Sequence, residues 1–198
     1  MVIHKPAGIL TVPGKTEDLQ DCMINRLVKL EPKTLLIHRL DRDTSGILVF
    51  GLSRWGQKSI SRQFQERQTD KTYQAIVAGH LEGQGTVDVP VIYDPSRPPL
   101  HIAELSHNKP AVTEWNAIEH FEIQGQPVTR VALTPITGRS HQLRVHMQFL
   151  GHPIVGDTLY AAPDQQDLMP RLCLHAERLS FHHPQTDERI EFICPVPF

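Results

Sequence analysis

Two short apolar runs near the start of the chain stand on either side of a densely charged segment. The first run covers residues 34–37 and the second covers residues 47–50, and both are rich in bulky or β-branched side chains. Runs of this length and composition, bounded by polar residues, are typical of buried β-strands. The segment between them, residues 38–46, is therefore predicted to be a loop held at the end of a rigid sheet.

This loop carries four charged side chains, namely Arg39, Asp41, Arg42 and Asp43. Charges beside a buried sheet are costly unless they are paired, and aspartate with arginine is the expected pairing. Asp43, Thr44 and Gly46 also match a plain turn, in which short polar side chains bond to nearby backbone N–H groups and glycine adopts a positive φ. Asp41 comes one step before that turn, directly after an apolar residue, which makes it the candidate functional carboxylate.

The order His-Arg-Leu-Asp, followed by Asp-Thr-Ser-Gly and an apolar strand, resembles the catalytic signature of the RluA-type pseudouridine synthases. Four further segments resemble motifs of that family in order and spacing: residues 5–8 (Lys-Pro-Ala-Gly), 71–75 (Lys-Thr-Tyr-Gln-Ala), 137–142 (Thr-Gly-Arg-Ser-His-Gln) and 174–176 (Leu-His-Ala). The five segments extend over nearly the whole chain. The resemblance implies an RNA-modifying isomerase that converts specific uridines to pseudouridine in structured RNA loops.

The resemblance also implies which side chains act. In the family, the aspartate that matches Asp41 is the nucleophile, and the arginine that matches Arg39 helps to displace the target nucleotide from its stack. The tyrosine that matches Tyr73 packs on the target base, the arginine that matches Arg139 pairs with the catalytic aspartate, and the leucine that matches Leu174 lines the uracil pocket. Asp41, Tyr73 and Arg139 are thus the expected catalytic residues, and Arg39 and Leu174 are expected to bind substrate.

Three polar residues within the same motifs, Arg42, Thr44 and His141, are further candidates for contact with the RNA substrate. For His141, as for Arg144 and His146 after it, solvated or capping roles fit the sequence about equally well. These positions are therefore weaker predictions than the five above.

Hydrophobic periodicity predicts helices as well as strands. Helices are expected over residues 19–28, over 53–67 with Ser53 as the N-cap, and over 139–150 with Arg139 in the first turn. Strands are expected over 1–4, 71–79, 113–121 and 128–133 and from 174 onward, with a hairpin turn at 124–127 and a stiff proline-rich loop at 94–99. Because arginine in a first turn opposes the helix dipole, we expect Arg139 to serve a group outside its helix.

Periodicity alone shows only that helices and strands are mixed. The family resemblance implies their arrangement, an α/β mixed (α+β) pseudouridine synthase fold in which a mostly antiparallel mixed sheet is flanked by helices around a central catalytic cleft. A length of 198 residues fits one domain with a sizeable core. We therefore expect residues 1–198 to form a single catalytic domain, without an S4-type RNA-binding domain and with an N-terminus shorter than is usual in the family.

Charge is distributed unevenly along the chain. The formal net charge of −2 argues against a nonspecific nucleic-acid binder. Residues 38–80 hold seven Lys or Arg against four Asp or Glu, whereas residues 81–125 hold two against seven, so positive charge gathers around Asp41. The helix predicted at 53–67 adds a basic face that is either simply solvated or in contact with phosphate. RNA is therefore expected to meet a local basic surface.

No cofactor or metal is expected. Pseudouridine formation exchanges a C–N bond for a C–C bond without net redox change, and the chain has no Rossmann or P-loop fingerprint. Cys22, Cys173 and Cys194 have no metal-like spacing and are expected to be reduced thiols. Cysteine and histidine gather between residues 173 and 183, but no second pair follows at the spacing of a zinc finger.

The sequence also predicts where the protein acts and on what. No apolar run approaches the roughly 20 residues that span a bilayer, and no charged-then-apolar leader opens the chain. We expect a cytoplasmic monomer with RNA, and no obligate protein, as its partner. Within the family, the proline-rich loop and residues 135–147 resemble members that modify a uridine in the tRNA anticodon loop and another in a 23S rRNA hairpin.

Three other functions stay open at this point. Asp41-Arg42-Asp43-Thr44 matches the Asp-x-Asp-x-Thr pattern of haloacid dehalogenase-like phosphatases, although the expected downstream lysine and acidic pair are missing. Asp41 and Asp43 share a face if they are extended, and two carboxylates about 5–5.5 Å apart serve retaining glycoside hydrolysis. A noncatalytic RNA-binding module is the third, and the intact set of expected catalytic residues argues against it.

Overall fold

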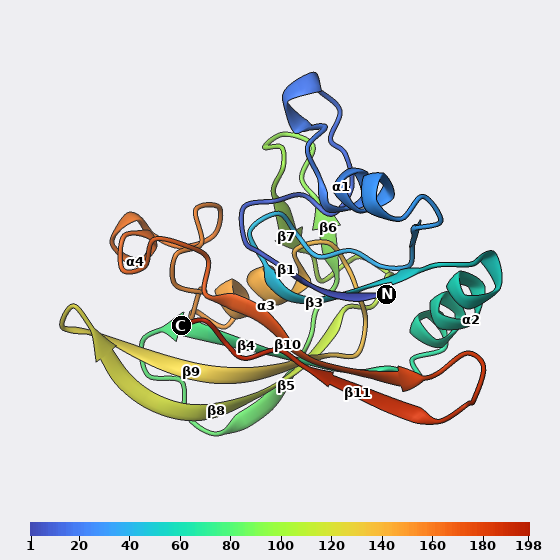
Figure 1. The fold of residues 1–198 in the computed structure, drawn as a ribbon. Coiled ribbons are helices and arrows are strands. Elements are labelled where there is room, and N and C mark those ends of the chain that lie inside the picture. Colours follow the sequence, from blue (N-terminus) through green and yellow to red (C-terminus); the bar gives the residue numbers. More distant parts are fainter. The chain divides into compact units, whose positions relative to one another are not determined.

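The structure is a computed structural model that describes all of residues 1–198. The chain forms two compact units, and Figure 1 shows it coloured along the sequence. Unit 1 comprises Met1–Lys71 and His175–Pro197, and unit 2 comprises Thr72–Leu174 together with Phe198. Unit 1 is therefore made from two separate segments of the chain, whereas unit 2, apart from one residue, is a continuous stretch.

The sheet of unit 1 is organised around β3 (Ser45–Gly51), whose residues are all buried. β3 pairs antiparallel with β1 (Val2–Lys5) and with β2 (Leu35–Leu36), and it pairs parallel with the start of β10 (Leu174–His182). β11 (Arg189–Ile193) continues the sheet antiparallel to β10. The two apolar runs therefore contain strands, as predicted, and residues 37–44 connect them, so the loop predicted over residues 38–46 ends before Ser45, where β3 begins.

Helix α2 (Arg54–Gln65) packs on this sheet. Its N-cap is Ser53, as predicted, whose hydroxyl oxygen accepts a hydrogen bond from the backbone N–H of Gly56 at 3.1 Å. Ile60 of the helix belongs to a buried apolar cluster whose sheet members are Ile47, Val49, Leu179 and Phe181. These members alternate along β3 and β10, so one face of the sheet carries the cluster.

The helix predicted over residues 19–28 is only partly present. Helix α1 spans Met23–Leu30, and Leu19 belongs to a separate 3-10 turn, η1 (Glu17–Leu19). Between them, Cys22 is extended, fully buried and bridged to Leu10. The prediction of one continuous helix was wrong because the apolar spacing comes from two elements separated by a buried extended residue.

Unit 2 contains an antiparallel sheet in the order β4 (Asp70–Ala78), β9 (Gln126–Pro135), β8 (Val112–Ile123) and β5 (Gln84–Asp88). β8 and β9 form a long hairpin, seen in Figure 1 as two curved ribbons side by side. The predicted hairpin is confirmed, but its turn consists only of Gln124 and Gly125, with φ of 51° and 76°. Two central residues with positive φ suit the twist of paired strands.

The remaining elements of unit 2 are short. β6 (Val91–Tyr93) and β7 (His101–Ala103) form a separate two-stranded sheet, and the predicted proline-rich loop connects them. Helix α4 (Pro163–Gln166) lies in the long connection between α3 (Gln142–Phe149) and β10.

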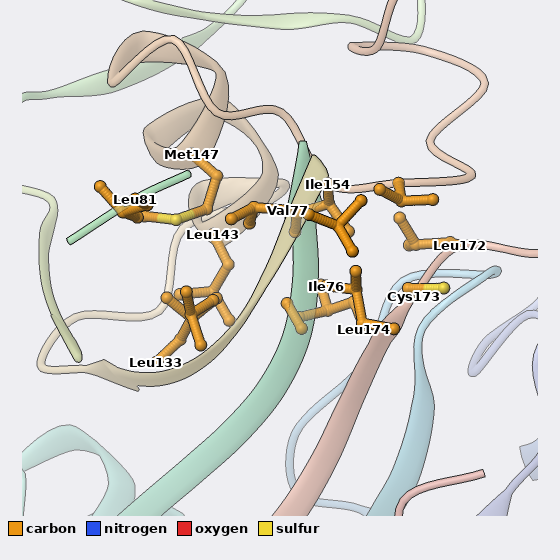
Figure 2. Close-up of a cluster of buried hydrophobic side chains, with 14 of the residues drawn as sticks. Ile76, Val77, Leu81, Leu133, Leu143, Met147, Ile154, Leu172, Cys173 and Leu174 are labelled. Atoms are coloured by element: carbon orange, nitrogen blue, oxygen red, sulfur yellow. The ribbon is translucent and has the colours of Figure 1, made fainter. Parts of the chain in front are cut away.

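The core of unit 2 gathers apolar side chains from its sheet, from α3 and from the segment that leads into β10. Figure 2 shows Leu143 and Met147 of α3 in this cluster with Leu133 of β9. Cys173 is a fully buried member, and burial raises the pKa of its thiol to about 11. The Cys173 side chain therefore packs in the core as an apolar group and is not a reactive thiolate at neutral pH.

The predicted α+β class with a mostly antiparallel mixed sheet is confirmed. Within each unit, every strand pairing is antiparallel except that of β3 with β10. None of the helices has both the length and the apolar character needed to cross a membrane.

Candidate active site

The loop that carries Asp41 is fixed on both sides by hydrogen bonds to polar groups of unit 1. On one side, the buried hydroxyl of Thr11 donates to the carbonyl oxygen of Leu40 at 2.7 Å and accepts from the backbone N–H of Leu40 at 3.1 Å. On the other side, the carbonyl oxygen of Arg42 accepts a hydrogen bond from the backbone N–H of Gly8 at 3.0 Å. Asp41 thus lies between two anchored peptide groups.

A buried cation completes this anchor. The ammonium group of Lys5 donates hydrogen bonds to the carbonyl oxygens of Pro6, Ile9 and Arg42, each at 2.8 Å. The residue is 0% exposed, and a buried ammonium is tolerated only where its donors are satisfied. Lys5 therefore positions the loop of Asp41. The family resemblance of residues 5–8 does not predict this role, and the signal in the sequence that could have revealed it is a lysine at a strand end, directly before a Pro-x-Gly turn.

His38 anchors the start of the same loop. Its Nε2 atom accepts a hydrogen bond from the backbone N–H of Val49 at 3.1 Å, and its ring stacks on Phe64 with centroids 4.5 Å apart. Burial, with a further contribution from the charge of Lys71, lowers the pKa of His38 to about 3. The ring is therefore neutral at physiological pH and serves as a fixed acceptor rather than as a proton donor.

The other polar side chains of the loop differ in exposure. Arg39 and Arg42 are exposed, and Arg42 forms a two-pronged ion pair with Asp43 at N–O distances of 3.0 and 3.1 Å. The expected pairing of aspartate with arginine in this loop is thus confirmed. Thr44 is only 2% exposed, which favours a structural role over the contact with RNA that we predicted.

Position 46 requires a glycine because the backbones of β3 and β10 approach each other closely there. Its φ is +117°, and a Cβ atom at this position would lie 2.3 Å from the carbonyl oxygen of Ala176 on β10. The predicted positive φ is confirmed, but the reason differs from the one expected. Gly46 lies in β3 and makes room for the neighbouring backbone, rather than closing a turn.

Two predicted site residues of unit 2 share one apolar environment. Tyr73 lies on β4 opposite Leu133 of β9 and packs, half-buried, against the core cluster of unit 2. Leu174 is 3% exposed and belongs to the same cluster. An aromatic ring beside buried aliphatic side chains is a surface suited to the face of a pyrimidine.

Arg139 lies in the loop before α3 and not in the helix itself. Helix α3 begins at Gln142, so the prediction that Arg139 stands in the first turn was wrong, and the helix dipole gives no argument about its role. The Arg139 side chain is exposed, and its Nε atom donates to the carbonyl oxygen of Pro110 at 3.1 Å.

Gln142 holds this loop in place. Its buried side-chain oxygen accepts hydrogen bonds from the hydroxyl of Thr137 at 2.7 Å and from the backbone N–H of Arg139 at 3.0 Å. Its amide nitrogen donates to the carbonyl oxygen of Val112 at 2.9 Å and to the hydroxyl of Thr113 at 3.0 Å. Gln142 therefore ties the loop of Arg139 to β8, a role that its place in the motif of residues 137–142 does not predict.

His141 is the N-cap residue of α3, in the left-handed conformation with φ of 56°. The hydroxyl of Tyr160 accepts a hydrogen bond from the backbone N–H of His101 at 2.9 Å and lies 2.6 Å from Nδ1 of His141, to which it can donate. The ring of His141 also contacts that of His101, with centroids 4.7 Å apart. His141 is therefore held by side chains of unit 2, on the loop that also carries Arg139.

Two of the weaker candidates are structural. Arg144 and Asp157 form a buried ion pair with N–O distances of 2.5 and 2.7 Å, at 3% and 0% side-chain exposure. His146 is fully buried between the hydroxyl of Thr113 and the carbonyl oxygen of Val89, and burial lowers its pKa. Their possible contact with RNA, which the sequence left open, is contradicted by this burial.

Comparisons with known proteins identify relatives over most of the chain. A family model described as RNA pseudouridylate synthase matches residues 1–149. Two similar proteins are both named dual-specificity RNA pseudouridine synthase RluA. That of Pasteurella multocida is 46% identical over 199 residues, covering 100% of this chain and 90% of its own length. That of Escherichia coli K12 is 44% identical over 200 residues, with the same coverage.

Solved structures agree with the sequence matches. Human RNA Pseudouridylate Synthase Domain Containing 1 matches with a TM-score of 0.83 at 33% identity, covering 100% of this chain and 80% of that one. Human RNA Pseudouridylate Synthase Domain Containing 4 matches with a TM-score of 0.76 at 26% identity, covering 99% of this chain and 85% of that one.

Proposed function

This chain belongs to the RNA pseudouridylate synthase family, and on that premise we propose that Asp41 is the nucleophile of an RNA pseudouridine synthase reaction. The reaction breaks the C1′–N1 bond of a uridine and forms a C1′–C5 bond, and the proton on C5 is removed. It requires an ionised nucleophile, a target base taken out of its stack, and a group that accepts the C5 proton.

The anchoring of the loop is the observation that carries the assignment of Asp41. The peptide groups of Leu40 and Arg42 are held by Thr11 and Lys5, at distances between 2.7 and 3.1 Å. A nucleophile must be held close to its productive geometry before the substrate arrives, because reordering it during the reaction raises the barrier. Asp43 is not assigned as the nucleophile, since its carboxylate pairs with the exposed Arg42.

We assign the other predicted residues to binding of the target uridine or to support of the nucleophile. Arg39, exposed and two residues before Asp41, is assigned to displace the target nucleotide from its stack. Tyr73 is assigned to pack on the flipped uracil, a contact worth about 1–3 kcal/mol per base, and Leu174 to line the pocket for that uracil. Arg139 is assigned to supply the positive charge that keeps the nucleophile ionised.

The exposed arginine of the surface ion pair, Arg42, is assigned to contact phosphate, as is His141 before α3. The burial of Thr44 removes that residue from this group. No metal or cofactor is assigned to the reaction, since every step uses a side chain of the chain or a group of the substrate.

The substrates we propose are the uridine of the tRNA anticodon loop (U32) and that of a 23S rRNA hairpin (U746). The support is the full-length similarity to proteins named dual-specificity synthases, at 44–46% identity. Flipping a base costs a few kcal/mol and least where the base is unpaired, which favours such loops. We further propose that the protein acts in the cytoplasm, as a monomer and as one catalytic domain.

The test is pseudouridine mapping on two short RNAs, an unmodified anticodon stem-loop and the rRNA hairpin, in buffer that contains EDTA. We expect one modified uridine in each RNA, detected by carbodiimide and primer extension, with no release of free base. Asp41→Asn should abolish turnover and leave RNA binding nearly intact, while the matched control Asp43→Asn should keep near wild-type activity.

Other outcomes separate the alternatives. Release of free uracil or sugar would indicate a hydrolase, and a loss of activity in EDTA that added Mg²⁺ alone restores would favour a metal-dependent phosphoryl-transfer enzyme. Near wild-type turnover by Asp41→Asn would contradict the assignment of the nucleophile. Modification of only one of the two RNAs would contradict the proposed dual specificity and leave the nucleophile assignment intact.

A further inference from the structure

Three side chains of unit 1 that commonly bind metal come together at one end of its sheet. The ligand atoms of His4, His175 and Cys194 all lie within 4.8 Å of one another. His4 is exposed, His175 is fully buried and Cys194 is half-buried. Two imidazole nitrogens and one cysteine sulfur form a donor set that suits Zn²⁺ in particular.

Strand register explains why these residues meet. His4 of β1 lies opposite Ile47 of β3, and His175 of β10 lies beside Ser45 of β3. Positions 45 and 47 are two residues apart on one strand, so they present their side chains to the same face. Cys194 follows β11, and its backbone N–H donates to the carbonyl oxygen of Glu177 at 2.8 Å, which places it along β10 near His175.

A hydrogen bond outside the group fixes one of the ligands. The hydroxyl of Ser45 lies 2.7 Å from Nδ1 of His175, and both residues are 0% exposed. Histidines that bind metal usually donate their second ring N–H to a fixed acceptor, which orients the ring and aims the other nitrogen at the ion. With Nδ1 bonded to Ser45, the nitrogen of His175 that faces Cys194 is Nε2.

Nε2 of His175 makes a long hydrogen-bond contact. It lies 3.2 Å from the carbonyl oxygen of Cys194, at the long end of the range for hydrogen bonds. The rings of His4 and His175 meet edge to face with centroids 5.6 Å apart. Because His4 is exposed, its ring can rotate toward the other two ligands without displacing core residues.

We propose that His4, Nε2 of His175 and Sγ of Cys194 bind one Zn²⁺ ion, with water as the fourth ligand. Ligand atoms around tetrahedral zinc lie about 3.5 Å apart, so the group closes by about 1 Å, mainly through His4. His4 comes from the first chain segment of unit 1, and the other two ligands come from the second. The ion therefore cross-links the two segments and stabilises their folded association.

The test is titration of the metal-free full-length protein with Zn²⁺ in competition with a chromogenic chelator, followed by thermal unfolding with and without the ion. We expect one ion per chain and a higher Tm with zinc. His4→Gln and Cys194→Ser should each weaken binding by about 100-fold or more, since loss of a ligand costs at least as much as loss of a supporting hydrogen bond. His183→Gln, another histidine of unit 1, is the control and should bind normally.

Two further measurements distinguish a specific zinc site from adventitious binding of the ion to surface histidines. Cobalt loading should give a thiolate-to-metal charge-transfer band that disappears in Cys194→Ser. Ser45→Ala should weaken zinc binding by about 10–100-fold through the orientation of His175. Wild-type affinity in His4→Gln, or a cobalt complex without the thiolate band, would overturn the proposal, and His4→Gln decides the question even if Cys194→Ser fails to fold.

Discussion

Two loops of this enzyme carry its predicted catalytic charges, and they are held in different ways. The loop of residues 37–44 in unit 1 carries Asp41 and is anchored by the buried ammonium of Lys5. The loop before α3 in unit 2 carries Arg139 and is anchored by the neutral amide of Gln142. Both anchors are buried side chains. Lys5 bonds to backbone carbonyl oxygens, whereas Gln142 bonds to backbone and hydroxyl groups.

A loop held by a buried cation should respond to substitution of its anchor differently from a loop held by a neutral amide. A buried cation is costly to desolvate and is stable only when hydrogen-bond acceptors surround it. Removal of the cation therefore leaves those buried acceptors without a strong hydrogen bond. A neutral amide costs less to bury, and its hydrogen bonds are individually weaker. We therefore expect the loop of the nucleophile to be the more sensitive of the two.

The largest effect is expected for Lys5→Met, which keeps the length of the side chain but removes the ammonium. Three carbonyl oxygens lose the hydrogen bond from the ammonium, although that of Arg42 keeps a second donor, the backbone N–H of Gly8. The free energy of unfolding should fall by about 3–5 kcal/mol. The turnover number should fall as well, because the peptide after Asp41 is no longer held. Urea unfolding and single-turnover kinetics measure the two effects. The exposed Lys15→Met is the control, and a loss below 1 kcal/mol in Lys5→Met would remove the contrast between the loops.

A smaller effect is expected for Gln142→Leu, which deletes the amide anchor. Four neutral hydrogen bonds are lost, and replacement by an apolar side chain of similar size limits the cost to about 2–3 kcal/mol. Activity should fall through misplacement of Arg139. Gln148→Leu, on the same helix but bonded only to the carbonyl oxygen of Tyr160, should cost less than about 1 kcal/mol. Equal losses in the two variants would show that the amide is not an anchor.

The third prediction uses the titratable anchor of the first loop, His38. Its folded pKa is about 3, against 6.5 for an ordinary histidine. Between these values the unfolded chain binds a proton that the folded chain does not, so the free energy of unfolding falls as the pH drops below about 6.5. At pH 5 this contribution amounts to about 2 kcal/mol.

The variant His38→Gln keeps an acceptor for the backbone N–H of Val49 and cannot titrate in this range. The difference in unfolding free energy between pH 7 and pH 5 should therefore be smaller in this variant than in the wild type. Urea unfolding at the two pH values measures it. An unchanged difference would mean that His38 is protonated as easily in the folded chain as in the unfolded one.

The smallest effect on stability is expected for Arg42→Ala, at the exposed end of the same loop. The ion pair with Asp43 is solvated, and such pairs contribute about 0–1 kcal/mol. If Arg42 contacts phosphate, the slope of log affinity against log salt for RNA should fall by about 1. Binding measured at several salt concentrations gives this slope, and an unchanged slope would leave Arg42 as a surface ion pair only.

The sequence predicted the parts of the fold that have a regular period. The apolar runs on either side of the charged segment are strands, the helix capped by Ser53 is present, and the long hairpin is where alternation placed it. The motif matches predicted the family. The helix expected over residues 19–28 failed because periodicity does not report a backbone that leaves the helix at one buried residue, Cys22.

The supports of the site could not be predicted from the sequence in this way. Lys5 and Gln142 are polar residues whose partners are backbone carbonyls and hydroxyls, some of them far away in sequence, and neither spacing nor composition reports such partners. For Arg144 and His146 the sequence left contact with RNA and solvated or capping roles open, whereas Asp157 and Thr113 hold the two side chains in the interior.

The construction of unit 1 from two segments has a consequence for synthesis on the ribosome. Ser45 and His175 are bonded although they lie 130 residues apart in sequence, and the intervening stretch contains nearly all of unit 2. During translation β3 is made early, but its neighbour β10 emerges only after unit 2 is complete. The edge of β3 that pairs with β10 in the folded protein is therefore uncovered while unit 2 is synthesised, although all residues of β3 are buried in the folded protein. We expect chaperones to protect this strand in the nascent chain.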